Sequence, residues 1–444
     1  MSGVCIENSL TEIEQIMKSI SIYIHIPFCV KKCQYCDFLS APADSRAQEV
    51  YLRTLKQEIR EQAARYREYE VQTVFIGGGT PTAVPCEKLC EVLKTVFTCY
   101  RVNPQAEISM EANPGTVTKE ALLSYRKAGI NRISIGLQSA DDVELKLLGR
   151  IHTYRDFQQT YRWAQEAGFT NINLDIMSAL PGQSVENYKK TLETVLSLKP
   201  QHISAYSLIV EEGTPFYEKY GQESEKLQAT GEKQPDLPSE EEEREMYALT
   251  EKLLAAAGYH RYEISNYALP GRECRHNLVY WKRGNYVGFG LGAASMVENV
   301  RFENIREMQE YLAEYAGMPD AEPVFAEVAQ GDAQVLSNEQ EFSLREDTHS
   351  ENEQELSIRE NVHPLSPQEQ MEETMFLGLR LTEGVSKAEF HRQFGVSMEQ
   401  IYGEVIRKNT AKGLLIDEAG YVCLTREGMD LSNYVMAQFL LDEV

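Results

Sequence analysis

The sequence has no apolar run long enough to cross a membrane, and its first residues lack the basic and apolar regions of a secretory signal. Its cysteines also lack the arrangement of a disulfide framework, since there are nine of them and they do not fall into pairs. Disulfides persist mainly in oxidising compartments. These absences predict a cytoplasmic protein.

Basic residues are scarce: 44 Lys and Arg stand against 68 Asp and Glu, which gives a formal net charge of −24. Binding to nucleic-acid phosphates relies on clustered Lys and Arg. We therefore expect no nucleic-acid partner. The chain has 444 residues, more than one hydrophobic core normally supports, so we expect more than one domain.

Three cysteines, Cys29, Cys33 and Cys36, lie on one short loop with the spacing C-x3-C-x2-C. Three thiolates on one loop can hold three corners of a [4Fe–4S] cluster and leave the fourth iron open to a ligand. A structural zinc ion would need a fourth ligand, and no Cys or His follows Cys36 at finger spacing. The remaining alternative is three unrelated thiols. The loop thus predicts a metal-binding cluster site.

The first half of the chain alternates between β-rich runs and segments with helical periodicity, such as Gln48–Tyr66, Lys119–Ala128 and Val185–Leu198. This alternation predicts an α/β fold in which crossover helices join parallel strands. Six such units predict a partial (β/α)6 TIM-like barrel over residues 20–220, after an N-terminal extension at 1–19. The expected strands are Ser21–Ile26, Gln72–Ile76, Glu107–Met110, Arg132–Ile135, Asn171–Ile176 and His202–Leu208.

Polar and glycine-rich motifs follow each expected strand, at the end where barrel enzymes build their sites. After the cysteine loop these are Gly77–Thr82, Glu111–Pro114, Gly136–Ser139, Leu180–Gln183 and Glu211–Pro215. Because the carboxyl ends of parallel strands share one edge of a sheet, we expect these motifs to face one cavity.

The second half of the chain has a different organisation. Residues 221–318 read as a barrel-completing segment with a charged helix over Glu240–Ala257, and the acidic stretch 319–365 reads as a disordered insertion. Residues 366–444 predict a winged-helix-like α+β domain. Its expected elements are helices Glu369–Arg380, Ser386–Phe394, Met398–Lys408 and Gly428–Leu440, and a hairpin of Leu414–Asp417 with Tyr421–Leu424.

Five segments of the sequence together resemble the radical S-adenosylmethionine (SAM) superfamily. They are Tyr23–Cys36, Gly77–Thr82, Glu111–Thr116, Asn131–Ser139 and Leu180–Gln183. More narrowly, they are similar to the coproporphyrinogen III dehydrogenase group, with its HemN and HemW branches. The resemblance runs from about Tyr23 to the C-terminus, and the acidic insertion is the main departure. It implies a [4Fe–4S] cluster on Cys29, Cys33 and Cys36 with SAM chelated at the open iron.

The resemblance also implies SAM-binding residues. A first SAM position matches Tyr23, Gly78 and Glu111, and a second, described in HemN, matches Tyr35, Gly79, Thr80, Gln138, Arg150 and Asp175. The residues alone leave alternatives open. The tyrosines could simply pack, the two carboxylates could pair with rim lysines, and Arg150 could be a helix-end cation. One or two SAM molecules could bind.

Two features favour the HemW branch. Cys36 is followed by Asp37 and Phe38, where HemN has Gly-Cys, and the motif His276, Asn277, Tyr280 and Trp281 resembles the heme-binding motif associated with HemW. An imidazole is a good axial ligand for heme iron, and aromatic faces suit a porphyrin. As one departure, Ala294 stands where the family usually has His.

We therefore expect a heme chaperone that binds heme and passes it to an acceptor protein. The alternative is an oxygen-independent coproporphyrinogen III dehydrogenase acting through a SAM-derived radical. A third, weaker alternative is a radical SAM enzyme with another substrate. Further expected partners are an electron donor such as flavodoxin or ferredoxin and a second copy of the chain in a homodimer.

Overall fold

The structure, a computed structural model, describes residues 17–221, 235–315 and 358–441. Its centre is a run of six parallel strands that hydrogen-bond in chain order, β1 to β6. The six expected strands are confirmed, most of them longer than expected. Their bounds are Lys18–Ile26 (β1), Tyr69–Gly78 (β2), Val102–Ala112 (β3), Arg132–Gln138 (β4), Ile172–Ser178 (β5) and His202–Ser207 (β6).

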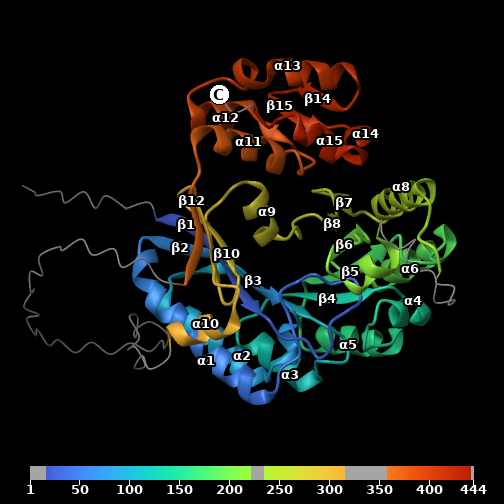
Figure 1. The fold of residues 1–444 in the computed structure, drawn as a ribbon. Coiled ribbons are helices and arrows are strands. Elements are labelled where there is room, and N and C mark those ends of the chain that lie inside the picture. Colours follow the sequence, from blue (N-terminus) through green and yellow to red (C-terminus); the bar gives the residue numbers. More distant parts are fainter. Residues whose placement is uncertain (1–16, 222–234, 316–357, 442–444) are drawn as a thin grey trace, which may run out of the picture.

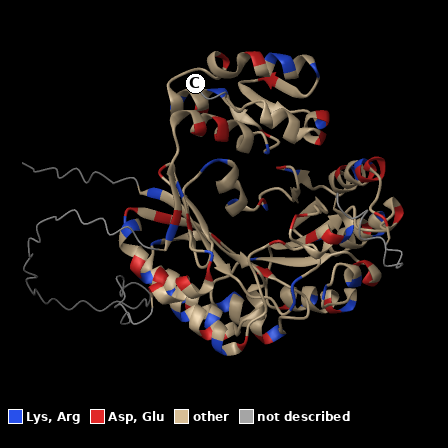
Figure 2. Cartoon of the chain, viewed as in Figure 1, with Lys and Arg blue, Asp and Glu red and all other residues tan. Residues whose placement is uncertain are grey.

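Crossover helices cover the outer face of this sheet (Figure 1). Side-chain oxygens accept hydrogen bonds from backbone N–H groups at the start of most of them, for example at Asp44, Thr153 and Ser184. Many charged residues lie on these outer helices (Figure 2). The helices are Ser45–Gln62 (α1), Cys86–Cys99 (α2), Lys119–Lys127 (α3), Asp142–Leu147 (α4), Tyr154–Glu166 (α5), Val185–Leu198 (α6) and Pro215–Tyr220 (α7).

Later strands extend the sheet at both edges, into a twelve-stranded sheet that runs from β12 to β7. β8 pairs antiparallel with β6, and β9 pairs parallel with β1. Within the described residues β12 and β7 are the two ends of this order, so the barrel is a partial one. These strands are His260–Arg261 (β7), Asn266–Ala268 (β8), Tyr286–Phe289 (β9), Ala294–Val297 (β10), Val300–Asn304 (β11) and Arg359–Pro364 (β12).

Three further helices belong to this part of the chain: Glu240–Ala256 (α8), Arg275–Trp281 (α9) and Met308–Glu314 (α10). In Figure 1, α9 lies between the inner face of the sheet and the C-terminal elements. None of the helices in the described ranges is long and apolar enough to span a membrane.

The prediction that residues 319–365 form a disordered insertion was wrong for the last residues of this range. Arg359–Pro364 forms strand β12, which pairs with β11. Ile358 is 1% exposed, and the guanidinium of Arg359 lies 4.0 Å from the centre of the Phe302 ring. Backbone hydrogen bonds to an existing edge order this segment despite its polar composition. Residues 319–357 lie outside the described part of the chain.

The C-terminal elements have a hydrophobic core of their own. The three expected helices and the hairpin are confirmed, but the single helix expected over Gly428–Leu440 was wrong. Two short helices stand there, because the backbone of Leu431, at φ −110° and ψ 28°, is not helical. The bounds are Pro367–Gly378 (α11), Val385–Ser386 (β13), Lys387–Phe394 (α12), Met398–Ala411 (α13), Leu415–Glu418 (β14), Tyr421–Leu424 (β15), Arg426–Asp430 (α14) and Ser432–Ala437 (α15).

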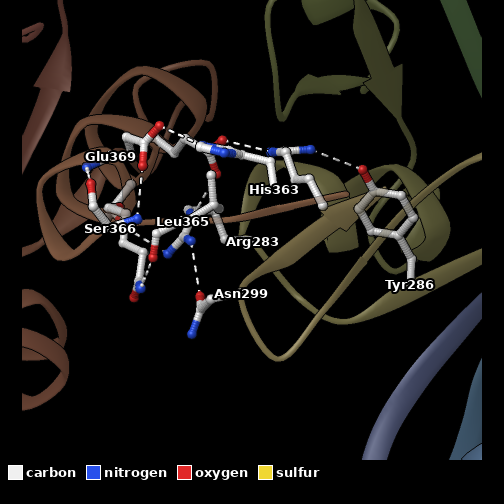
Figure 3. Close-up of polar contacts among 11 residues, drawn as sticks. Arg283, Tyr286, Asn299, His363, Leu365, Ser366 and Glu369 are labelled. Atoms are coloured by element: carbon white, nitrogen blue, oxygen red, sulfur yellow. Dashed lines mark hydrogen bonds and ion pairs between the residues drawn. The ribbon is translucent and has the colours of Figure 1, made fainter. Parts of the chain in front are cut away.

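An ion-pair cluster joins the C-terminal elements to the sheet. Glu373 on α11 accepts from Arg283 at 3.1 Å and from Arg301 on β11 at 2.8 Å. Figure 3 shows Arg283 also reaching the side chain of Asn299, at 3.0 Å. The backbone N–H of Leu365 donates to the carbonyl of Asn299, which fixes the chain where it leaves β12.

Candidate functional site

A cavity of about 360 Å³ opens at the carboxyl ends of the parallel strands. The expectation that the strand-end motifs face one cavity is confirmed for Gly77–Thr82, Glu111–Pro114 and Gly136–Ser139, whereas Leu180–Gln183 and Glu211–Pro215 do not line it. The sequence-predicted residues that line it come from the cysteine loop, from the strand-end motifs and from α9. They are Cys29, Cys33, Tyr35, Cys36, Gly78, Gly79, Thr80, Glu111, Gln138, Arg150, Asp175 and Asn277.

The cysteine loop is fixed to the cavity wall by side-chain contacts. The sulfur of Cys29 lies 3.4 Å from the hydroxyl oxygen of Thr80, and Arg150 donates to the sulfur of Cys33 at 3.7 Å. Burial raises the pKa of the Cys36 thiol to about 11, and the neighbouring Cys33 and Cys29 add to this. A thiolate at Cys36 therefore needs a nearby cation or metal.

The described cysteines form no disulfide. No three His, Cys, Asp or Glu side chains in the described part of the chain are grouped as ligands of a single metal ion. A [4Fe–4S] cluster does not need such a group, because each thiolate binds a different iron at a corner of the cube. Three thiols around one cavity thus suit a cluster better than a single ion.

The glycines at the end of β2 are required by close packing. A Cβ at Gly78 would lie 2.6 Å from the ring of His25, and the backbone φ of +113° there already favours glycine. A Cβ at Gly79 would lie 2.7 Å from the carbonyl oxygen of Phe28 and 3.1 Å from the sulfur of Cys29. These glycines let the β2 loop approach the cysteine loop, in addition to leaving room for a ligand.

Asn113, for which the sequence predicted no role, connects two predicted site residues. It donates to the hydroxyl of Thr80 at 2.8 Å and accepts from Arg150 at 2.7 Å. Arg150 also donates to the carbonyl of Gly136 at 2.9 Å. The guanidinium of Arg150 thus forms part of the cavity wall, and Arg150 is not a helix-end cation. The place of Asn113 within the strand-end motif Glu111–Pro114 is the signal that could have identified it.

Two half-buried carboxyl groups, those of Glu111 and Asp175, face the cavity. Burial, and to a smaller extent the nearby Asp175, raise the pKa of Glu111 to about 8, although the backbone N–H of Gly78 opposes this. Asp175 accepts from Ser134 at 3.0 Å and from Asn173 at 2.7 Å, and burial raises its pKa as well. Neither carboxyl pairs with a lysine among the described residues, so the rim ion pairs left open by the sequence do not form there.

The two predicted tyrosines differ in position. Tyr35 lines the cavity and packs beside Phe216. Tyr23 does not line the cavity, and its hydroxyl lies 3.0 Å from Nδ1 of His25. Gln138 accepts a hydrogen bond from the hydroxyl of Tyr206 at 3.0 Å. The sequence offered no signal for Tyr206.

His276 is a buried residue of α9 that is 1% exposed. Its Nδ1 lies 2.7 Å from the hydroxyl of Thr73, which itself donates to Ser21. Thr73 must therefore accept from Nδ1, and Nε2 is left to accept from the hydroxyl of Tyr280 at 2.8 Å. Burial lowers the pKa of His276 to about 3, so the ring is neutral.

The other members of this motif point in different directions. Asn277 lines the cavity, whereas the ring of Tyr280 meets Tyr286 edge to face at 4.7 Å. The ring of Trp281 lies 4.3 Å from the guanidinium of Arg380 on the C-terminal side. The motif thus spans the space between the cavity and the C-terminal elements. Ala294 is exposed at the start of β10 and does not line the cavity.

Comparisons with known proteins match this architecture. The model of the radical SAM superfamily matches residues 23–195, and that of the HemN C-terminal domain matches residues 365–431. The solved structure of coproporphyrinogen III oxidase (HemN) from Escherichia coli superposes with a TM-score of 0.74 at 21% identity, over 96% of this chain and 90% of that one. This likeness establishes the fold.

Curated relatives identify the family. The chain is 36% identical to the heme chaperone HemW of Bacillus subtilis over 421 residues, which cover 95% of this chain and 99% of the relative. It is 33% identical to the heme chaperone HemW of Lactococcus lactis over 432 residues, or 97% and 99% of the two chains. These identities over nearly the whole of both chains show that the chain belongs to the HemW family of the radical SAM superfamily.

Proposed function

We propose that this protein is a heme chaperone that binds heme and transfers it to an acceptor protein. It would carry a [4Fe–4S] cluster on Cys29, Cys33 and Cys36 and bind exchangeable SAM beside it. The observation that carries the proposal is the convergence of these three thiols with Gly78, Thr80 and the other strand-end residues on one cavity. Membership of the HemW family supports the heme-carrying role.

The cavity residues suit SAM. When bound, the cluster supplies an open iron and a source of one electron. Glu111 in its ionised form accepts hydrogen bonds from the amino or hydroxyl groups of a ligand, and Asp175 offers a second acceptor. Arg150, held against Cys33 by Asn113, supplies positive charge beside the cluster thiolates. Buried polar groups need partners, so a polar ligand satisfies this wall better than an apolar one.

The heme would bind at α9, between the cavity and the C-terminal elements. Tyr280 and Trp281 offer aromatic faces to a porphyrin. His276 carries its ring proton on Nδ1, so Nε2 has the free electron pair that an iron ligand requires. The hydroxyl of Tyr280 occupies this nitrogen and would have to move aside when iron binds.

The experiment is anaerobic reconstitution of the cluster followed by heme titration, read from the Soret band, with the wild type and His276→Ala. The same preparations are assayed for conversion of coproporphyrinogen III with SAM and a reductant. Stoichiometric heme binding that weakens in the variant, without turnover, supports the chaperone. Turnover without tight heme binding would overturn it in favour of the dehydrogenase.

A further inference from the structure

One buried cation on the cavity wall has no hydrogen-bond partner. Arg132, the first residue of β4, is 2% exposed and lines the cavity. Its guanidinium forms no hydrogen bond or ion pair within residues 17–221, 235–315 and 358–441, and its Nε is buried there without a partner. A buried charge without hydrogen bonds is costly to the fold. Buried polar groups are nearly always paired, so Arg132 points to an acceptor that a ligand brings into the cavity.

The carboxyl groups near Arg132 are occupied by other donors. Burial tends to lower the pKa of Arg132, but nearby groups that include Glu107 and Asp175 outweigh it and raise the pKa. Glu107 accepts from the first two backbone N–H groups of α9, both at 3.1 Å. Asp175 accepts from Ser134 at 3.0 Å and from Asn173 at 2.7 Å. The guanidinium therefore remains charged, while its N–H groups stay free to donate to a ligand.

The inner face of β4 places Arg132 at the end of the cavity opposite the cysteine loop. The alternate residues of this strand that line the cavity are Arg132, Ser134, Gly136 and Gln138. Gln138 is the last residue of the strand, at the end where the cysteine loop lies, and six residues of strand span about 20 Å. A ligand whose carboxylate chelates the cluster cannot offer the same carboxylate to Arg132. The acceptor for Arg132 therefore belongs to a group at the other end of the cavity.

Helix α9, which carries the proposed heme motif, begins beside Arg132. Ser109 on β3 is the register partner of Arg132. Glu107, two positions before Ser109, accepts from the backbone N–H of His276. Burial, and to a smaller extent the charge of Arg132, lower the pKa of His276 to about 3. Asn277, the next residue, lines the same cavity, and its side-chain amide forms no hydrogen bond in the described part of the chain. A ligand held by His276 therefore has two free donors beside it, those of Arg132 and Asn277.

These two donors suit a carboxylate. The planar fork of a guanidinium matches the two oxygens of a carboxylate, and such charge-assisted pairs are among the strongest hydrogen bonds in proteins. Heme carries its carboxylates on propionate side chains at the edge of the ring, away from the axial position of the iron. We propose that Arg132 binds a heme propionate, with Asn277 as a second donor, when His276 ligates the iron. This inference rests on the proposed function, because it requires heme at α9.

The test compares heme with heme dimethyl ester, which keeps the iron and the ring but has no free carboxylate. Each is titrated into the full-length reconstituted protein, in the wild type and in Arg132→Met, and binding is read from the Soret band. Methionine occupies the space of an arginine stem and removes the cost of burying a charge, so the variant is expected to fold. Arg155→Met, which replaces an exposed arginine on α5, is the matched control. Equilibrium binding of SAM is measured for every variant.

We expect the wild type and the control to bind heme about 10- to 100-fold more tightly than the ester, as a charge-assisted hydrogen bond contributes. Arg132→Met should bind both forms with the affinity of the ester and keep the Soret position, because His276 still ligates the iron. Equal affinities of the wild type for heme and ester would overturn the inference. So would a loss of affinity for both forms in Arg132→Met, which would show a structural role, or a loss of SAM binding alone, which would assign Arg132 to SAM. If the wild type binds no heme at all, the proposed function itself fails.

Discussion

Glu107 on β3 accepts a hydrogen bond from the backbone N–H of His276, at 3.1 Å, although 169 positions separate the two residues. The same carboxylate accepts from the N–H of Arg275 at 3.1 Å. Helix α9 has no capping side chain of its own, since its first flanking residue is Cys274. A strand of the parallel sheet thus caps the helix that carries the proposed heme motif.

Replacing Glu107 tests this remote cap. Glu107→Gln removes the charge and one of the two acceptors, so we expect the free energy of unfolding to fall by about 1–2 kcal/mol. Heme affinity should fall too, because α9 loses its fixed start. Chemical denaturation and Soret titration measure the two effects, with the exposed Glu49→Gln as control. Equal stability of the two variants would contradict the capping role.

Tyr280→Phe tests whether the tyrosine hydroxyl blocks the imidazole of His276. The variant keeps the aromatic face but frees Nε2, and a hydrogen bond contributes about 1 kcal/mol. We therefore expect heme to bind about fivefold more tightly than in the wild type, with the same Soret position. His276→Ala should instead bind more weakly. If Tyr280→Phe weakens binding as much as His276→Ala, the hydroxyl itself contacts the heme.

Gly79→Ala tests the close approach of the β2 loop to the cysteine loop. The added Cβ would meet the backbone oxygen of Phe28, which cannot turn away as a flexible side chain can. We expect the variant to fold but to retain less iron and sulfide after reconstitution. The control is Gly403→Ala on α13, where the nearest atom would lie at 3.8 Å. Full cluster content in Gly79→Ala would refute the packing argument.

The raised pKa of Glu111 predicts a pH-dependent affinity for SAM. At neutral pH the carboxyl is mostly protonated, because its pKa is about 8 in the ligand-free cavity. A ligand that needs the ionised form must displace this proton, so affinity should rise about tenfold per pH unit below 8 and level off above it. Equilibrium binding from pH 6.5 to 9 measures this. Glu111→Gln should bind weakly at every pH, and an equally steep slope in that variant would assign the titration to another group.

The sequence predicts those parts of the molecule whose structure is set locally. Strands β1 to β6 are apolar runs bounded by turns, and the cysteines of the loop have the spacing C-x3-C-x2-C. Both features can therefore be recognised from the sequence alone. Strands such as β7, with two residues, carry no periodicity and form only because a neighbouring edge is available. The same holds for β12, whose polar sequence indicated disorder.

Site residues divide in the same way. Glu111 and Thr80 lie in motifs at strand ends, where the sequence already points to a site. Tyr206 gains its role only from its contact with Gln138, far away in the sequence. The cap of α9 by Glu107 could not be predicted either, since no local signal relates a carboxylate on β3 to a helix 169 positions later.

Glu373 should hold the C-terminal elements against the sheet. The side chain of Arg283 is only 4% exposed, so Glu373→Ala would leave a buried cation without its partner, at a cost of about 3–5 kcal/mol. Arg301→Ala removes the more exposed arginine, at 34%, and should cost about 1 kcal/mol or less. Urea denaturation of both variants measures the difference, and limited proteolysis near Leu365 reports whether the junction opens.

Equal losses of stability in the two variants would show that burial of Arg283 does not govern this contact. A large loss confined to Glu373→Ala, with faster cleavage at the junction, would show that one carboxylate positions the C-terminal elements beside α9.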